Sequence, residues 1–186
     1  MSSLLDNKEL HLKDYLHSAV FASLTAVGAI SAFAIPFGPV PITLQMVFIY
    51  LAGGLLGARK AALSQVIYLI MGVIGLPVFS RGGAGIGHLM GPSGGYIFGF
   101  IAGAFVIGYI SSSKKRFSLE ISMVLGTLVI YAIGSLQLML VTGMSYDKAL
   151  MVGVVPFIPL DAMKMIIALY VITRIKTLGF HLDDRV

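Results

Sequence analysis

The chain consists mainly of long apolar runs, separated by short groups of glycine, proline, serine and charged residues. The segment VIYLIMGVIGL, residues 66–76, is apolar on every face and does not alternate between apolar and polar positions. Such runs are typical of helices that cross a membrane, where one crossing needs about 20 apolar residues. We therefore predict an all-α membrane protein with six transmembrane helices, at about residues 16–35, 43–58, 61–79, 95–111, 119–142 and 157–175.

The composition supports the same conclusion. Of the 186 residues, 58% are hydrophobic and 11% are charged, and the mean hydropathy is +0.95, which a soluble domain of this length could not bury. The chain has no cysteine, which excludes disulfides and thiolate metal sites. Because the first residues lack the layout of a cleaved signal peptide, we expect a single membrane domain over 1–186, with a cytoplasmic segment at 1–15 and a cytoplasmic tail at 176–186.

Basic residues lie at the ends of the apolar runs, and their placement predicts the orientation of the chain. The net charge is +5, but the basic residues form no single patch, so we expect no nucleic-acid partner. Cytoplasmic connections of membrane proteins carry an excess of Lys and Arg, so both termini are expected in the cytoplasm. With six crossings, one side holds Lys8, Lys13, Arg59, Lys60, Lys114, Lys115, Arg116, Arg174, Lys176 and Arg185, and the other holds Arg81 and Lys148.

The connections on the two predicted sides differ in length and composition. The cytoplasmic ones are short and basic, whereas the outer ones are rich in glycine and proline, as in SRGGAGIGHLMGPSGG at residues 80–95. Long loops without secondary structure are uncommon unless they are functional or disordered. We interpret the outer connections as a folded cap over an outward-facing site, with a purely connecting role as the alternative.

Asp161 and Lys164 interrupt the last apolar run, PFIPLDAMKMIIALYVITRI, at residues 156–175. Each costs about 2.5–3.5 kcal/mol in the middle of a membrane helix, whereas an i,i+3 ion pair returns only about 0.2–0.5 kcal/mol. Both side chains are therefore expected to face the protein interior or a wet cavity, roughly 6 and 10 Å from the outer end of the helix. The alternatives are a favourable position at the helix N-terminus for Asp161, and a packing tether or snorkelling for Lys164.

Motifs for catalysis, nucleotides and metals are weak. Ser93 lies in GPSG, which matches the GxSG of intramembrane serine proteases, but a nucleophilic serine needs a histidine within hydrogen-bond distance. His88 lies in the same loop, and no later predicted helix carries a histidine. The chain has no phosphate-binding P-loop motif, and its four histidines lack metal-ligand spacing. We expect no enzyme activity, no cofactor and no metal.

Small side chains recur along the first predicted helix. Ala19, Ala22, Ala26 and Ala29 follow one another at spacings of three and four residues. Such a stripe lets another helix approach closely. From the pattern alone, packing inside this chain is favoured over the docking of a partner.

Three outer segments closely resemble, in the same order, the biotin-specific substrate-binding subunits (the BioY family) of energy-coupling factor (ECF) vitamin transporters. They are FGPVPITLQ (37–45), GLPVFSRGGAGIGHLMGPSGGYIFGF (75–100) and VPFIPLDAMK (155–164), and the resemblance spans about residues 15–175. It implies a six-helix, multi-pass protein of the cell membrane that captures biotin from outside. It also implies two kinds of partner, a transmembrane coupling protein (the T component) and two cytoplasmic ATPases, with Ala22-xxx-Ala26 docking the coupling protein, which reverses the preference from the pattern alone.

Biotin has a ureido group, a carboxylate and apolar parts, so its site needs an acceptor, a cation or other donor, and apolar walls. We expect Asp161 to accept from a ureido N–H, and Lys164 to bind the ureido oxygen or the carboxylate. Arg81 departs from the family pattern and is either an added ligand contact or neutral. Two further hypotheses are a self-sufficient proton-coupled carrier, with Asp161 as a proton relay, and an intramembrane hydrolase that uses Ser93. The remaining residues expected to line the site are Thr43, Gln45, Ser80 and Tyr96.

Overall fold

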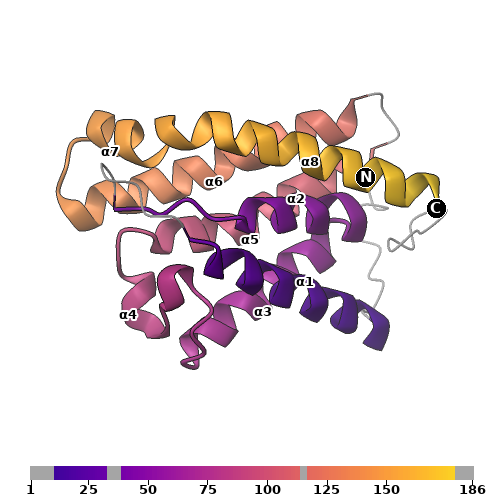
Figure 1. Ribbon diagram of the computed structural model, residues 1–186, viewed down its shortest axis with the longest axis horizontal. Coiled ribbons are helices and arrows are strands. Elements are labelled where there is room, and N and C mark those ends of the chain that lie inside the picture. Colours follow the sequence, from indigo (N-terminus) through magenta and orange to yellow (C-terminus); the bar gives the residue numbers. More distant parts are fainter. Residues whose placement is uncertain (1–10, 33–38, 114–116, 179–186) are drawn as a thin grey trace, which may run out of the picture.

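The computed structural model describes residues 11–32, 39–113 and 117–178, and within these ranges every regular element is a helix. Outside them lie residues 1–10 and 179–186 of the predicted cytoplasmic ends, residues 33–38, and the basic group at 114–116. The long helices lie side by side along the longest axis of the molecule (Figure 1). The elements are α1 (Leu12–Ile30), α2 (Gln45–Leu56), α3 (Ala58–Val73), η2 (Ser80–Gly82), α4 (Gly85–Leu89), α5 (Gly94–Ser111), α6 (Ser118–Thr142), α7 (Tyr146–Gly153), η3 (Val155–Phe157) and α8 (Ile158–Thr177).

Each of the six predicted crossings overlaps mainly one helix of 12 to 25 residues, and the all-α class is confirmed for the described residues. Three stretches are long and apolar enough to span a membrane: Gly94–Ser111, Ser118–Thr142 and Tyr146–Thr177. Gln45–Leu56 is apolar but shorter. The count of six crossings therefore stays a prediction.

The third predicted crossing, 61–79, is too long. The α3 helix ends at Val73, and Gly75 has a φ of +104°, a left-handed conformation that stops the helix. Phe79 then folds back, and its fully buried ring occupies the space that a Cβ on Gly72 would need. A residue assigned to the end of a crossing thus belongs to the outer connection.

The connections predicted to lie outside the membrane contain two helices that were not predicted, α4 and α7. In Figure 1 both lie at one end of the molecule, opposite the end where α1 starts and α8 finishes. These connections are therefore folded structures, as expected of a cap.

The α5 and α6 helices share the most extensive contact of any helix pair in the described residues, and glycines make their approach possible. A Cβ on Gly99 would lie 3.0 Å from the Cα of Ile130, and one on Gly103 would lie 2.5 Å from the Ile130 side chain. Backbones that pack this closely gain dispersion contacts, which are a main source of helix association in lipid. The pair thereby fixes the positions of Tyr96 on α5 and Tyr131 on α6.

The α1 helix packs against α2 and α3 through a polar seam. Ser18 Oγ donates to the carbonyl of Lys60 at 3.0 Å, and Gln65 Nε2 donates to Thr25 Oγ1 at 3.3 Å. Near the start of α1, Asp14 forms an ion pair with Lys60 at 3.1 Å. These bonds fix the rotation of α1 about its axis.

Candidate ligand-binding site

Asp161 and Lys164 lie in the first two turns of α8, on its buried face. The Lys164 Nζ donates to Asp161 Oδ1 at 2.7 Å, and the two side chains are 8% and 5% exposed. The helix begins just after Phe157 with Pro159 in its first turn, so the Asp161 carboxylate lies near the positive end of the helix dipole. The start of the helix therefore stabilises the acid, and the acid in turn is the counter-charge of the lysine one turn later.

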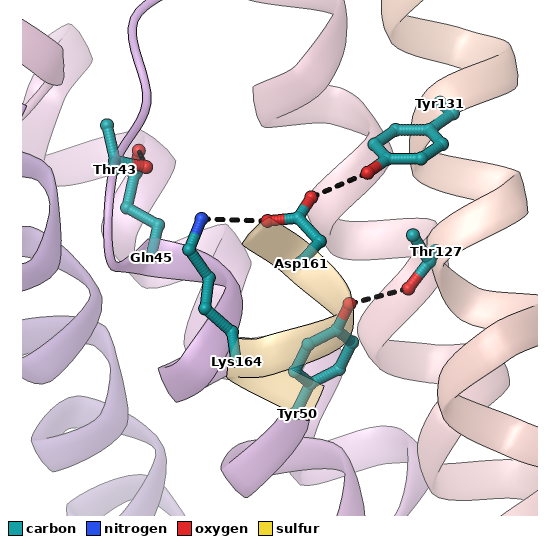
Figure 2. Close-up of polar contacts among 7 residues, drawn as sticks. All are labelled: Thr43, Gln45, Tyr50, Thr127, Tyr131, Asp161 and Lys164. Atoms are coloured by element: carbon teal, nitrogen blue, oxygen red, sulfur yellow. Dashed lines mark hydrogen bonds and ion pairs between the residues drawn. The ribbon is translucent and has the colours of Figure 1, made fainter. Parts of the chain in front are cut away.

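The second oxygen of Asp161 accepts a hydrogen bond from another helix. The Tyr131 hydroxyl of α6 donates to Asp161 Oδ2 at 2.7 Å. Figure 2 shows this arrangement, with Lys164 on one side of the carboxylate and Tyr131 on the other. Each carboxylate oxygen has a further lone pair, and Lys164 Nζ uses one of its three N–H donors within the described residues. The group can thus both accept from and donate to a bound molecule.

This ion pair borders a cavity. The centre of a water molecule can occupy about 50 Å³ of it, several times the roughly 10–15 Å³ that one water needs. The empty space totals about 560 Å³ when the part open to solvent is included. Its walls combine apolar side chains with converging polar groups, as in small-molecule sites. The apolar lining is Val40, Pro41, Met46, Ile97, Phe100, Ile130 and Phe157, and the polar lining is Thr43, Gln45, Tyr68, Ser80, Ser93, Tyr96, Tyr131, Asp161 and Lys164.

Six of the seven predicted ligand residues line this cavity, although they come from four separate parts of the chain. They are Thr43 and Gln45 around the start of α2, Ser80 in η2, Tyr96 in α5, and Asp161 and Lys164 in α8.

Arg81 is the exception. It is exposed, it has a φ of +59°, and it is not among the lining residues. The chain turns at this residue, between Phe79 and Gly83, which form a β-bridge. This tight turn places Ser80 in the lining and leaves Arg81 at the surface, and whether Arg81 is an added ligand contact or neutral stays a prediction.

A chain of hydrogen bonds connects the start of α2 with the connection that follows α3. Thr43 Oγ1 donates to Gln45 Oε1 at 2.9 Å, and Gln45 Nε2 donates to the Tyr68 hydroxyl at 2.7 Å. Tyr68 in turn donates to the carbonyl of Val78 at 3.1 Å. These bonds hold the polar side of the cavity in one arrangement before any ligand enters.

Sequence reasoning missed Tyr68 and Tyr131, and treated Ser93 only as a nucleophile. A tyrosine inside an apolar run is a clue, because its buried hydroxyl needs a partner. The clue does not separate the cavity from the core, however. Tyr50 has the same sequence context, but its hydroxyl bonds to Thr127 and it does not line the cavity (Figure 2).

The structure also changes the interpretation of His88. His88 lies in the same connection as Ser93, and the fold of this connection places its Nε2 3.3 Å from Ser93 Oγ. The two side chains are therefore in hydrogen-bond contact, although only Ser93 lines the cavity. Among the described residues no carboxylate hydrogen-bonds to His88, so the pair lacks the third member of a catalytic triad. In the part of the chain that the structure describes, no group of three or more possible metal-ligating side chains occurs.

The alanine stripe of α1 is mostly internal. Ala22 and Ala29 are fully buried and Ala26 is 7% exposed, on the face that packs against α2 and α3. Only Ala19 is exposed. In the isolated chain Ala22 and Ala26 are therefore internal, and the docking role inferred from the resemblance stays a prediction. The small residues on the exposed face of α1 are instead Ala19 and Ser23.

Comparison with known proteins adds the family. The model of the BioY family matches residues 3–179. The chain is 39% identical over 168 residues to the Biotin transporter BioY of Thermotoga maritima, covering 90% of this chain and 98% of the relative. It is 40% identical over 158 residues to the Probable biotin transporter BioY of Pyrococcus horikoshii, covering 85% and 93%.

A solved structure has the same fold. A crystal structure described as the S-component for biotin from an ECF-type ABC transporter superposes with a TM-score of 0.81 at 30% identity. The match covers 94% of this chain and 95% of that chain. With a family model that spans nearly its whole length and relatives of this similarity, the chain belongs to the BioY family.

Proposed function

We propose that this chain binds biotin in the cavity beside Asp161 and Lys164, and that it delivers the vitamin into the cell as the S component of an ECF-type ABC importer. The observation that carries the proposal is the buried ion pair, which faces open space and retains hydrogen-bonding capacity. Burying two charges costs several kcal/mol per ion. A polar ligand that completes the hydrogen bonds of both side chains explains why the two charges are buried at this place.

The cavity matches the chemistry of biotin. The Asp161 carboxylate can accept from a ureido N–H, and the Lys164 ammonium can donate to the ureido oxygen or the carboxylate. Apolar side chains such as Phe100 and Phe157 suit the aliphatic tail and the fused ring. The hydroxyls of Ser80 and Tyr96, with Thr43 and Gln45, provide further polar contacts. The activity is capture and transport, and no bond is made or broken in this chain.

Calorimetric titration of the purified chain tests the proposal. We expect saturable binding of biotin, with one site per chain, and no comparable binding of thiamine or riboflavin. Absence of heat with biotin, in a preparation that melts cooperatively, would overturn the proposal.

We further propose a membrane arrangement and partners. The chain crosses the cell membrane six times with both termini in the cytoplasm, and it works with a T component and two cytoplasmic ATPases. Two observations support this topology: the start of α1 and the end of α8 lie at one end of the molecule, and the basic residues Arg174 and Lys176 close α8. Uptake by vesicles that hold this chain alone, if abolished by collapse of the proton gradient, would favour a self-sufficient carrier instead.

For docking of the coupling protein, this chain offers an accessible surface on the exposed face of α1. Ala19 and Ser23 are its small residues, and the Ser23 hydroxyl donates to the carbonyl of Ala19 at 2.9 Å, so it needs no partner in lipid. Ala19→Trp should abolish uptake with the partners while biotin binding by the isolated chain stays within about twofold. Val124→Trp, at an exposed position of α6 away from this surface, is the matched control. Retained uptake by Ala19→Trp would contradict this docking surface.

A further inference from the structure

Ser93 lines the cavity at the residue directly before α5, and His88 is its hydrogen-bond partner at 3.3 Å. His88 itself is not among the lining residues. The histidine therefore contacts the serine without lining the cavity itself. Neither residue has a role in the biotin-binding arrangement derived so far.

The His88 ring is held by packing on its faces. It stacks on Phe79 with ring centroids 5.1 Å apart and an interplanar angle of 22°. Phe79 is fully buried and meets Tyr68 edge-on at 5.6 Å. A Cβ on Gly83 would collide with the His88 ring, so a glycine at that position makes room for it. The position of Nε2 is thus set by tertiary contacts.

The turn between His88 and Ser93 is also fixed. Gln137 of α6 donates through Nε2 to the carbonyl of Leu89 at 2.6 Å and to that of Gly91 at 3.0 Å. These bonds tie the turn to the closely packed α5–α6 pair. The distance between His88 and Ser93 therefore depends on a supported backbone rather than on an isolated loop.

The chemistry of the pair determines what Ser93 can offer to a ligand. Burial lowers the pKa of His88, so the imidazole is neutral at neutral pH and has one N–H donor and one acceptor nitrogen. When Nε2 carries the proton, it donates to Ser93 Oγ. The serine O–H is then free to donate into the cavity. A serine without this partner can rotate its hydroxyl toward other acceptors, so the histidine restricts the serine to one orientation.

We propose that His88 is a positioning residue for ligand recognition, which holds the Ser93 hydroxyl so that it donates to an oxygen of the bound molecule. The inference rests on the proposed function, because it assigns a further part of the same site. Asp161 and Lys164 bind one polar group of biotin, and Ser93 supplies an additional donor from the outer connection. His88 acts only through Ser93 and does not touch the ligand.

A double-mutant cycle tests the proposal by calorimetric titration with biotin. The variants are His88→Phe, which keeps a flat ring against Phe79 but removes the nitrogens, Ser93→Ala, and the double variant. We expect His88→Phe to weaken biotin binding about fivefold, since one neutral hydrogen bond is worth about 1 kcal/mol. In the Ser93→Ala background the same change should weaken binding less than about twofold, because the two residues act as one unit.

Rescue separates positioning from a structural role. His88→Gln loses the ring stack but keeps an N–H near Nε2, so it should bind biotin within about twofold of the wild-type chain. Equal losses from His88→Phe in both backgrounds, or no loss in either, would overturn the proposal, as would failure of His88→Gln to restore binding. If Asp161→Asn abolishes binding while His88→Phe does not change it, only the positioning role fails. If the wild-type chain does not bind biotin, the proposed function and this inference fail together.

Discussion

Two buried ion pairs of the same chemistry lie in different surroundings. Asp161 and Lys164 are three residues apart on α8 and border a cavity, with a 2.7 Å contact. Asp14 and Lys60 join α1 to α3 over 3.1 Å, and neither of them is among the residues that line the cavity. Both side chains of the second pair are 9% exposed, so it is almost as well buried as the first.

The difference is in how the remaining hydrogen-bonding capacity is used. Asp14 Oδ2 accepts from the backbone N–H of His11 at 2.9 Å, and the Lys60 carbonyl accepts from Ser18. The His11 backbone thus satisfies the second carboxylate oxygen of Asp14, and the Ser18 bond joins α1 to α3 beside the pair. Among the residues that the structure describes, the Asp161–Lys164 pair has one further hydrogen bond, from Tyr131, and it borders open space. Burial of a charge therefore does not identify a binding site by itself, whereas a buried charge beside open space does.

The largest expected effect is on ligand binding through α8. Asp161→Asn should weaken biotin binding about 30-fold or more, because it leaves Lys164 buried without its counter-charge and replaces an acceptor oxygen by a donor. Titration calorimetry on the purified variant measures this. Asp14→Asn is the matched control at the structural pair and should bind biotin within about twofold of the wild-type chain. Equal binding by Asp161→Asn and the wild-type chain would contradict a role for this pair in recognition.

The second effect concerns stability at the structural pair. Asp14→Asn should lower the free energy of unfolding by about 1–3 kcal/mol, since it removes the ion pair with Lys60 and weakens the bond from the His11 N–H. Thermal melting in detergent, followed by circular dichroism, is the measurement. A melting temperature equal to that of the wild-type chain would show that this pair does not hold α1 against α3.

A pair of tyrosine variants sharpens the comparison within the core. Tyr131→Phe removes the hydroxyl that donates to Asp161, and it should weaken biotin binding about fivefold. Tyr50→Phe removes a similar buried hydroxyl that bonds to Thr127 outside the cavity lining, and it should change binding less than about twofold. If the two variants weaken binding equally, contact with Asp161 is not what makes Tyr131 important.

The smallest effect is the pH dependence of stability from Asp14. Burial acts to raise the pKa of this carboxyl, but the His11 N–H and the Lys60 ammonium outweigh burial, and the pKa lies below the ordinary value of 3.8. The ionised form is therefore favoured by folding. Its stabilisation is complete above the unfolded pKa and is lost as the pH falls through the lower folded pKa. Between about pH 5 and 3, melting temperature should fall less steeply for Asp14→Asn than for the wild-type chain. Parallel curves would contradict this contribution.

Much of the fold follows from elementary constraints in the sequence. The α6 helix spans Ser118–Thr142, where an apolar run predicted 119–142, and it ends where Gly143 takes a φ of +70°. In lipid a long apolar run has no alternative to a helix that satisfies its own backbone, so such boundaries are predictable. The outer connections contain both apolar and turn residues, and α4 and α7 depend on contacts with the helix ends that no local pattern encodes.

The part of the candidate site that could be predicted is the part with an unusual free-energy cost in a membrane. Asp161 and Lys164 could be found because a charge in a membrane helix requires a reason. Tyr131 could not be assigned to them, since their contact depends on how α6 lies beside α8. The alanine stripe shows the same limit: spacing indicates that α1 has a small-residue face, but the rotation set by the Ser18 and Asp14 bonds decides that Ala22 faces inward.

The most direct test of the central claim is an experimental structure of the chain with biotin bound. The account predicts a ureido or carboxylate group of biotin within about 3.2 Å of the Asp161 carboxylate or the Lys164 ammonium. Biotin bound elsewhere, or bound in the cavity without a polar contact to either residue, would contradict it.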